Sequence, residues 1–173
     1  KNEHVVLDGS IELDLNWEKY QGNIYKAKLK TSIWQLFVND ISLTSARWPN
    51  GNWNDGSVWD KAQSMSWPEK NKGSYGHHFN KELAAINGDL TGAIIIVNSG
   101  SFKTFKSNII EHIPGADNFK YDTKRKNIKV HFSFKGKTHR HGYFLEGKLA
   151  LLDEENEWFY NRSVINPQYG FTT

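Results

Sequence analysis

The 173-residue chain has the length of one domain and can bury a substantial core without disulfides or metal ions. It has no cysteine, which excludes a disulfide framework, a cysteine-ligated zinc site and a thiol nucleophile, and no apolar run approaches the roughly 20 residues that a membrane span needs. Its 7 Trp, 7 Tyr and 10 Phe accompany a mean hydropathy of −0.67 and a net charge of +3, so the aromatic rings either fill a β-sheet core or are displayed.

Short segments in which apolar and polar residues alternate predict β-strands along most of the chain. Half-buried strands are expected at residues 11–15, 24–30 and 128–134, strands covered on both faces at 33–38 and 93–97, and a further strand at 148–152. One helix of one or two turns is expected at 80–86, with Asn80 as its N-cap. The pattern predicts an all-β fold, a single antiparallel β-sandwich of the jelly-roll type over residues 1–173.

Residues 46–79 interrupt this pattern with a long aromatic-rich loop that contains Trp48, Trp53, Trp59 and Trp67. Long irregular segments are often binding loops, and an indole can stack on the C–H face of a pyranose while Asn and Asp bind its hydroxyls. Trp48 and Trp67 each precede a proline, which favours extended, packed anchors. Trp53 and Trp59 are therefore the predicted stacking residues, and the alternative is that all these rings are buried.

Positive charge is concentrated in residues 120–141, here called the basic block, where 8 Lys and Arg accompany one Asp for a net charge of +7. Such a patch attracts phosphate, sulfate or uronate groups. The residues expected to contact them are Arg125, Lys126, Lys137, His139, Arg140 and His141. The alternative is a solvated strand face and hairpin rim without a ligand.

The histidine pairs His77-His78 and His139-Arg140-His141 are weak metal signals, because neither supplies more than two ligands on one strand face. They are interpreted as surface or anion-contacting residues. A structural Ca²⁺ site with oxygen ligands from Asn52, Asn54, Asp55 and Asp60 stays open, but no other cofactor is expected. The acidic residues 153–157 are interpreted as a charged turn, and nucleic acid is not expected as a partner because most aromatic residues lie outside the basic block.

Several motifs resemble a β-sandwich domain attached to, or inserted in, right-handed parallel β-helix enzymes that degrade polysaccharides. The motifs are Trp17-Glu-Lys-Tyr20, Gln35-Leu-Phe-Val-Asn39, Ala46-Arg-Trp-Pro-Asn50, Asp89-Leu-Thr-Gly-Ala93, Tyr143-Phe-Leu-Glu146, Leu152-Asp153 and Glu157-Trp-Phe-Tyr160. The resemblance implies structural roles, with Arg47 in an internal ion pair and Trp158 in the core. The helical coils that would carry catalytic carboxylates have no counterpart here, so no catalytic residue is assigned.

The expected function is that of a non-catalytic carbohydrate-binding module for an anionic, sulfated or uronic polysaccharide. Its expected partner is a glycoside hydrolase or lyase domain of the same polypeptide, in a secreted, cell-surface or periplasmic bacterial protein from which this chain would be excised. No membrane contact is expected. Two alternatives remain: a structural accessory domain with an exposed apolar patch, or a lyase or glycosidase that works beside the basic block.

Overall fold

The computed structural model describes residues 8–51, 55–57, 75–98, 104–123, 142–161 and 168–172. Within these residues the secondary structure is almost entirely β-strand, with two short 3₁₀ helices, η1 (Lys81–Ala85) and η2 (Leu149–Leu151). The prediction of an all-β fold is confirmed. No helix in the described part of the chain is long and apolar enough to cross a bilayer.

The larger sheet has six strands and carries most of the buried core. Its order is β6 (Arg47–Trp48), β11 (Gly142–Glu146), β8 (Ile94–Asn98), β9 (Thr104–His112), β10 (Asn118–Asp122) and β7 (Tyr75–Phe79), and every neighbouring pair is antiparallel. Alternation along these strands directs Ile95, Phe119 and Leu145 into one core. The prediction of a strand at residues 93–97 is confirmed by β8, which lies between β11 and β9.

The smaller sheet has five strands and a much smaller core. Its order is β1 (Glu18–Gln21), β2 (Ile24–Lys28), β13 (Gln168–Thr172), β12 (Glu157–Tyr160) and β5 (Thr44–Ser45), and β12 and β5 form a parallel pair. A separate hairpin pairs β3 (Phe37–Val38) with β4 (Ile41–Ser42). The buried cluster beside these strands consists of Leu36, Leu43 and Trp158. β2 confirms the strand predicted from the alternation after residue 24.

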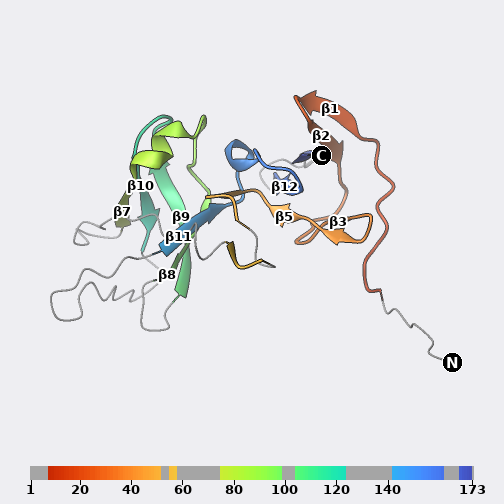
Figure 1. Cartoon of the computed structure of the whole chain (residues 1–173), viewed down its shortest axis with the longest axis horizontal. Coiled ribbons are helices and arrows are strands. Elements are labelled where there is room, and N and C mark those ends of the chain that lie inside the picture. The colour runs from red at the N-terminus through yellow and green to blue at the C-terminus, as the bar shows by residue number, and fades with distance from the viewer. Residues whose placement is uncertain are drawn as a thin grey trace.

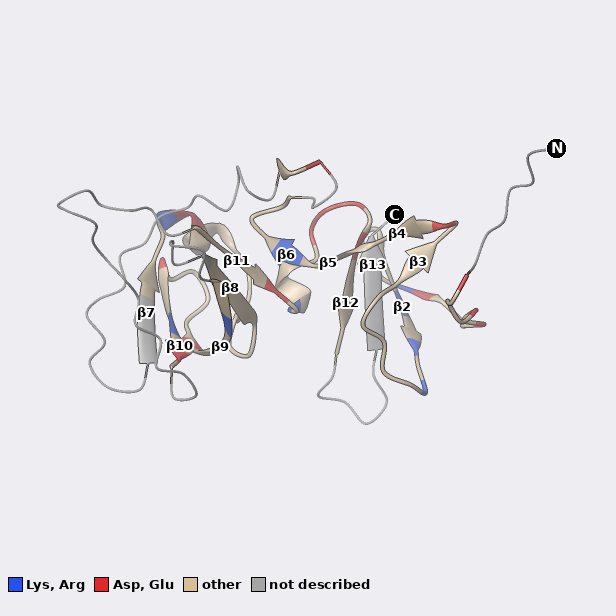
Figure 2. Cartoon of the chain, turned by 90° about the horizontal axis from the view of Figure 1, so that it is seen from below, with Lys and Arg blue, Asp and Glu red and all other residues tan. Residues whose placement is uncertain are grey.

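The two sheets lie side by side along the long axis of the molecule, with β5 and β6 between them (Figures 1 and 2). The chain passes directly from β5 in the smaller sheet to β6 in the larger one. Ile24 and Phe159 of the smaller sheet also pack against the core of the larger sheet. The two sheets therefore contact each other through these side chains. At this boundary, segments that are far apart in the sequence lie next to each other.

Three of the predicted strands are wrong in whole or in part. Residues 11–15 form no strand, because their alternation has no strand to pair with in the described part of the chain. Only the last two residues of the predicted strand 33–38 are in β3, and Trp34 is exposed instead of covered. Residues 148–152 contain η2, since a short apolar run does not distinguish a strand from a helical turn.

Other predictions about the strands and the helix have mixed outcomes. η1 confirms the short helix, and Asn80 Oδ1 accepts a hydrogen bond from the Glu82 backbone N–H at 3.0 Å, as expected of an N-cap. The interpretation of His78 as a surface residue is wrong. Its ring is buried, with ring centroids 4.9 Å from Tyr143 and 5.2 Å from Tyr121, because β7 turns it toward the core. The predicted strand at 128–134 lies outside the described residues.

Candidate functional site

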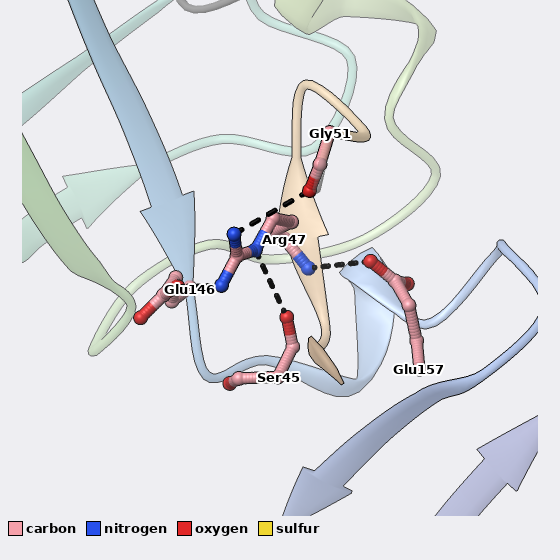
Figure 3. A network of polar contacts seen from close by, with 5 residues as sticks. All are labelled: Ser45, Arg47, Gly51, Glu146 and Glu157. Atoms are coloured by element: carbon pink, nitrogen blue, oxygen red, sulfur yellow. Dashed lines mark hydrogen bonds and ion pairs between the residues drawn. The ribbon is translucent and has the colours of Figure 1, made fainter. Parts of the chain in front are cut away.

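A buried ion pair between two strands of the larger sheet lies at the boundary with the smaller sheet (Figure 3). Arg47 of β6 donates from Nη2 to Glu146 Oε1 of β11 at 2.6 Å, and its side chain is only 5% exposed. The guanidinium also donates to the backbone oxygens of Ser45 and Gly51, each at 3.4 Å. The Arg47 backbone N–H donates to Glu157 Oε1 of β12 at 3.1 Å. One residue thus links three strands from both sheets.

Four of the motifs quoted for the resemblance, at residues 46–50, 143–146, 152–153 and 157–160, meet at this same junction. Glu146 lies opposite Arg47 in the β11–β6 register, and the Ala46 backbone N–H donates to the Trp158 oxygen at 2.8 Å. Asn50 donates from Nδ2 to Asp153 Oδ1 at 3.1 Å and to a Glu154 carboxylate oxygen at 3.3 Å. The internal ion pair of Arg47 and the core position of Trp158, which is 6% exposed, are confirmed. These motifs hold the two sheets together.

Burial shifts the pKa of two carboxyl groups in the junction. Desolvation raises the pKa of Glu157 to about 8, although the hydrogen bond from the Arg47 backbone partly opposes this, and desolvation also raises the pKa of Glu146 against the attraction of Arg47. The folded state therefore holds a proton on Glu157 that the unfolded chain, with its ordinary pKa of 4.5, releases. Stability from this group is full below about pH 4.5 and is lost as the pH rises toward 8.

A cleft of 1410 Å³ lies beside this junction, between the two sheets. One wall comes from the β1–β2 hairpin, residues 20–24, together with Trp34. The other comes from loop residues 87–92, residues 146–150 after β11, and the acidic turn at residues 153–155. Figure 2 shows the acidic segment that leads into β12 at the boundary between the sheets. The cleft is thus assembled from segments far apart in the sequence.

Two aromatic side chains of the cleft are displayed instead of buried. Trp34 is 83% exposed and Tyr20 is 47% exposed, although both line the cleft. Lys26 Nζ lies 5.2 Å from the centroid of the Tyr20 ring, and it is paired with Glu18 at 3.3 Å. This contact supports one face of the Tyr20 ring. A ligand could therefore stack on these two rings without any rearrangement of the cleft.

The remaining lining combines apolar and polar residues, and its charged side chains carry an excess of negative charge. Amide side chains come from Gln21, Asn23, Asn87, Asn108 and Asn161, and carboxyl groups from Asp89, Glu146, Asp153, Glu154 and Glu155. Among the described lining residues the one cation is Lys148, whose Nζ donates to the Thr91 oxygen at 2.7 Å. Rings beside amides and carboxylates can stack on and hydrogen-bond a polyhydroxylated ligand.

The described residues test few of the predicted site positions. Trp53, Trp59, Arg125, Lys126, Lys137, His139, Arg140 and His141 all lie outside them, as does Trp67. Of the open Ca²⁺ ligands only Asp55 is described, and its carboxylate accepts a hydrogen bond from the Ser57 backbone at 2.8 Å. No group of three or more His, Asp or Glu suited to a metal ion occurs in the part of the chain that is described. Trp48 packs against the larger core, 6.1 Å from the Tyr143 ring, as expected of an anchor.

Sequence reasoning missed Trp34 and Tyr20 as site residues. Trp34 was assigned to a covered strand because apolar residues surround it, yet the polar Thr31-Ser32 before it and Gln35 after it were a signal of exposure. The burial of His112 was also not predicted from the sequence. His112 is buried, accepts a hydrogen bond at Nδ1 from the Leu90 backbone at 3.2 Å, and has a pKa lowered by desolvation.

Comparisons with known proteins support the fold. No protein-family model and no curated protein matches the sequence. The structure is similar to a solved structure described as "Glycoside hydrolase", with a TM-score of 0.62 and 13% sequence identity. The match covers 90% of this chain and 27% of that chain, so this chain spans about a quarter of that protein's length. At this identity the two chains share a fold.

Proposed function

We propose that this chain binds polysaccharide without cleaving it, and that the cleft between its two sheets is a binding site. The observation that carries the proposal is the exposed Trp34 ring in the lining of a large cleft that also presents amide and carboxyl side chains. The likeness to a protein described as a glycoside hydrolase supports a carbohydrate context. The chain would then direct an attached catalytic domain to its substrate.

The size of the Trp34 contribution follows from its area. A tryptophan buries about 150–250 Å² when fully covered, and a sugar stacked on one face covers about half of that. At about 25 cal/mol per Å² the gross gain is about 2–3 kcal/mol. Association entropy consumes part of this gain, so the expected loss of affinity on removing the ring is about tenfold or more.

A panel of polysaccharides tests the proposal directly. Affinity gel electrophoresis against neutral, uronic and sulfated polysaccharides should retard the protein on at least one of them. If migration is unchanged on every member of the panel, the chain is not a polysaccharide-binding protein. Release of reducing ends or unsaturated products from the same panel would instead establish a lyase or glycosidase.

The basic block remains a separate prediction of an anion site, with Arg125, Lys126, Lys137, His139, Arg140 and His141 as its contacts and Trp53 and Trp59 as its stacking residues. A ligand held there by charge would bind more weakly as salt is raised, because the Debye length falls from about 10 Å at 0.1 M to about 3 Å at 1 M. Retention that is insensitive to salt would show that the basic block is not the site.

A second candidate function, that of a structural accessory domain, is favoured by the exposed apolar residues near the smaller sheet. Of the ten large hydrophobic side chains that are exposed in the described residues, six fall between positions 11 and 41: Ile11, Trp17, Tyr20, Trp34, Phe37 and Ile41. Exposed apolar groups of this kind often pack against another domain. If Phe37→Ser with Ile41→Ser raises solubility and abolishes binding of a hydrophobic dye while glycan binding persists, the hairpin is a docking surface distinct from the cleft.

A further inference from the structure

We propose that the cleft selects an uncharged stretch of glycan and rejects uronate and sulfate groups. This inference rests on the proposed function and names the ligand class of the same site. It also separates the cleft from the basic block, which is expected to attract anions. The two regions therefore predict opposite ligand preferences, and only binding to the basic block should weaken as salt is raised.

The charges that line the cleft carry the argument. The carboxylates of Asp89 and of the turn at residues 153–155 line a space in which the one cation among the described lining residues is Lys148. Lys148 is already bonded to the Thr91 oxygen. Arg47, just behind the cleft, is paired with Glu146, and Lys26 beside Tyr20 is paired with Glu18. Arg47 and Lys26 are thus matched by acids, Lys148 is bonded to a carbonyl oxygen, and the excess charge of the lining is negative.

These carboxylates are also held in place. Asn50 donates hydrogen bonds to both Asp153 and Glu154. The Thr91 backbone N–H donates to Asp89 Oδ1 at 2.8 Å, and this bond lowers the pKa of Asp89, so its carboxylate stays ionised at neutral pH. Side chains that are fixed in this way do not swing away when an anion approaches. The negative electrostatic potential of these carboxylates should therefore persist when a ligand enters the cleft.

Hydrogen-bond chemistry gives the same selectivity. An ionised carboxylate only accepts hydrogen bonds, and a sugar hydroxyl can donate one. A uronate or sulfate group only accepts, so it would gain no hydrogen bond from Asp153 or Glu154 and would also be repelled. Several unit charges about 10 Å away in water disfavour an added anion by about tenfold before salt screening. A hexose or pentose chain satisfies the same groups without that penalty.

The test is calorimetric titration of the whole chain with cello-, manno- and xylohexaose and with hexamannuronate and hexagalacturonate, in low salt with EDTA so that Ca²⁺ cannot bridge acids. At least one neutral hexasaccharide should bind about tenfold more tightly than either uronate. Trp34→Ala should weaken that binding by about tenfold. The combined variant Asp153→Asn, Glu154→Gln and Glu155→Gln should narrow the gap between neutral and uronic ligands severalfold, whereas Glu12→Gln, an exposed acid outside the cleft, should leave it unchanged.

The outcomes separate the inference from the function on which it rests. A uronate that binds as tightly as the neutral chains, and that loses affinity with Trp34→Ala, would overturn the inference while leaving the cleft as a binding site. Neutral binding that Trp34→Ala does not change would also overturn it, since the ligand would lie elsewhere. Absence of binding by all five oligosaccharides and by the polysaccharide panel would overturn the proposed function itself.

Discussion

Replacement of Arg47 by methionine is expected to destabilise the protein by about 3–5 kcal/mol, because it leaves a partly buried carboxylate without its cation. Methionine retains most of the apolar stem of arginine, so the loss is mainly ionic. Glu146 can escape the penalty by taking up a proton. At pH 7 that costs at most about 3 kcal/mol, from the 2.5 units between pH 7 and its ordinary pKa of 4.5. Loss of the hydrogen bonds to Ser45 and Gly51 adds about 1 kcal/mol.

Urea unfolding followed by far-UV circular dichroism measures this difference. Lys26→Met is the matched control, because it breaks an exposed pair with Glu18 and should cost no more than about 1 kcal/mol. Adding Glu146→Gln to Arg47→Met should recover part of the loss, and the loss should be smaller at pH 5 than at pH 8. If Arg47→Met costs no more than Lys26→Met, or if Glu146→Gln recovers nothing, the ion pair does not stabilise the junction.

Three further changes test the junction and the packing. From pH 5 to pH 8 the wild type should lose stability relative to Glu157→Gln by up to about 1.4 kcal/mol per pH unit, and parallel urea midpoints would contradict the raised pKa. Gly88→Ala should destabilise by about 1–3 kcal/mol in thermal unfolding because a Cβ there would lie 2.5 Å from the Ala150 Cβ, whereas Gly9→Ala, with open space, should be neutral. Leu145→Ala should cost about 2–5 kcal/mol in urea, and a loss under 1 kcal/mol would refute its place in the core.

The sequence was sufficient to predict those strands and helices that are determined by their own residues and immediate neighbours. The alternation after residue 24 became β2, the apolar run before residue 97 became β8, and Asn80 caps η1. The motif residues Arg47 and Trp158 also have the structural roles that the resemblance implied. In each case the neighbours in sequence, or a recognisable motif, determine the surroundings of the residue.

The cleft was not predictable in the same way, because its walls come from different parts of the chain. Tyr20, Trp34 and Lys148 meet only because the two sheets lie side by side, and no periodicity reports that arrangement. Residues 11–15 show the converse, since their alternation is correct for a strand but they pair with no strand among the described residues. His78 was assigned to the surface from its residue type, whereas its aromatic neighbours on other strands make the core favourable.

Calorimetric titration of wild type, Trp34→Ala and Phe37→Ala with the tightest-binding neutral hexasaccharide tests the central claim most directly. Both side chains are exposed, but only Trp34 lines the cleft, so Phe37→Ala controls for the loss of an exposed ring. The cleft account predicts a loss of affinity of about tenfold or more for Trp34→Ala and no change for Phe37→Ala. Equal affinities for Trp34→Ala and wild type would contradict binding in the cleft.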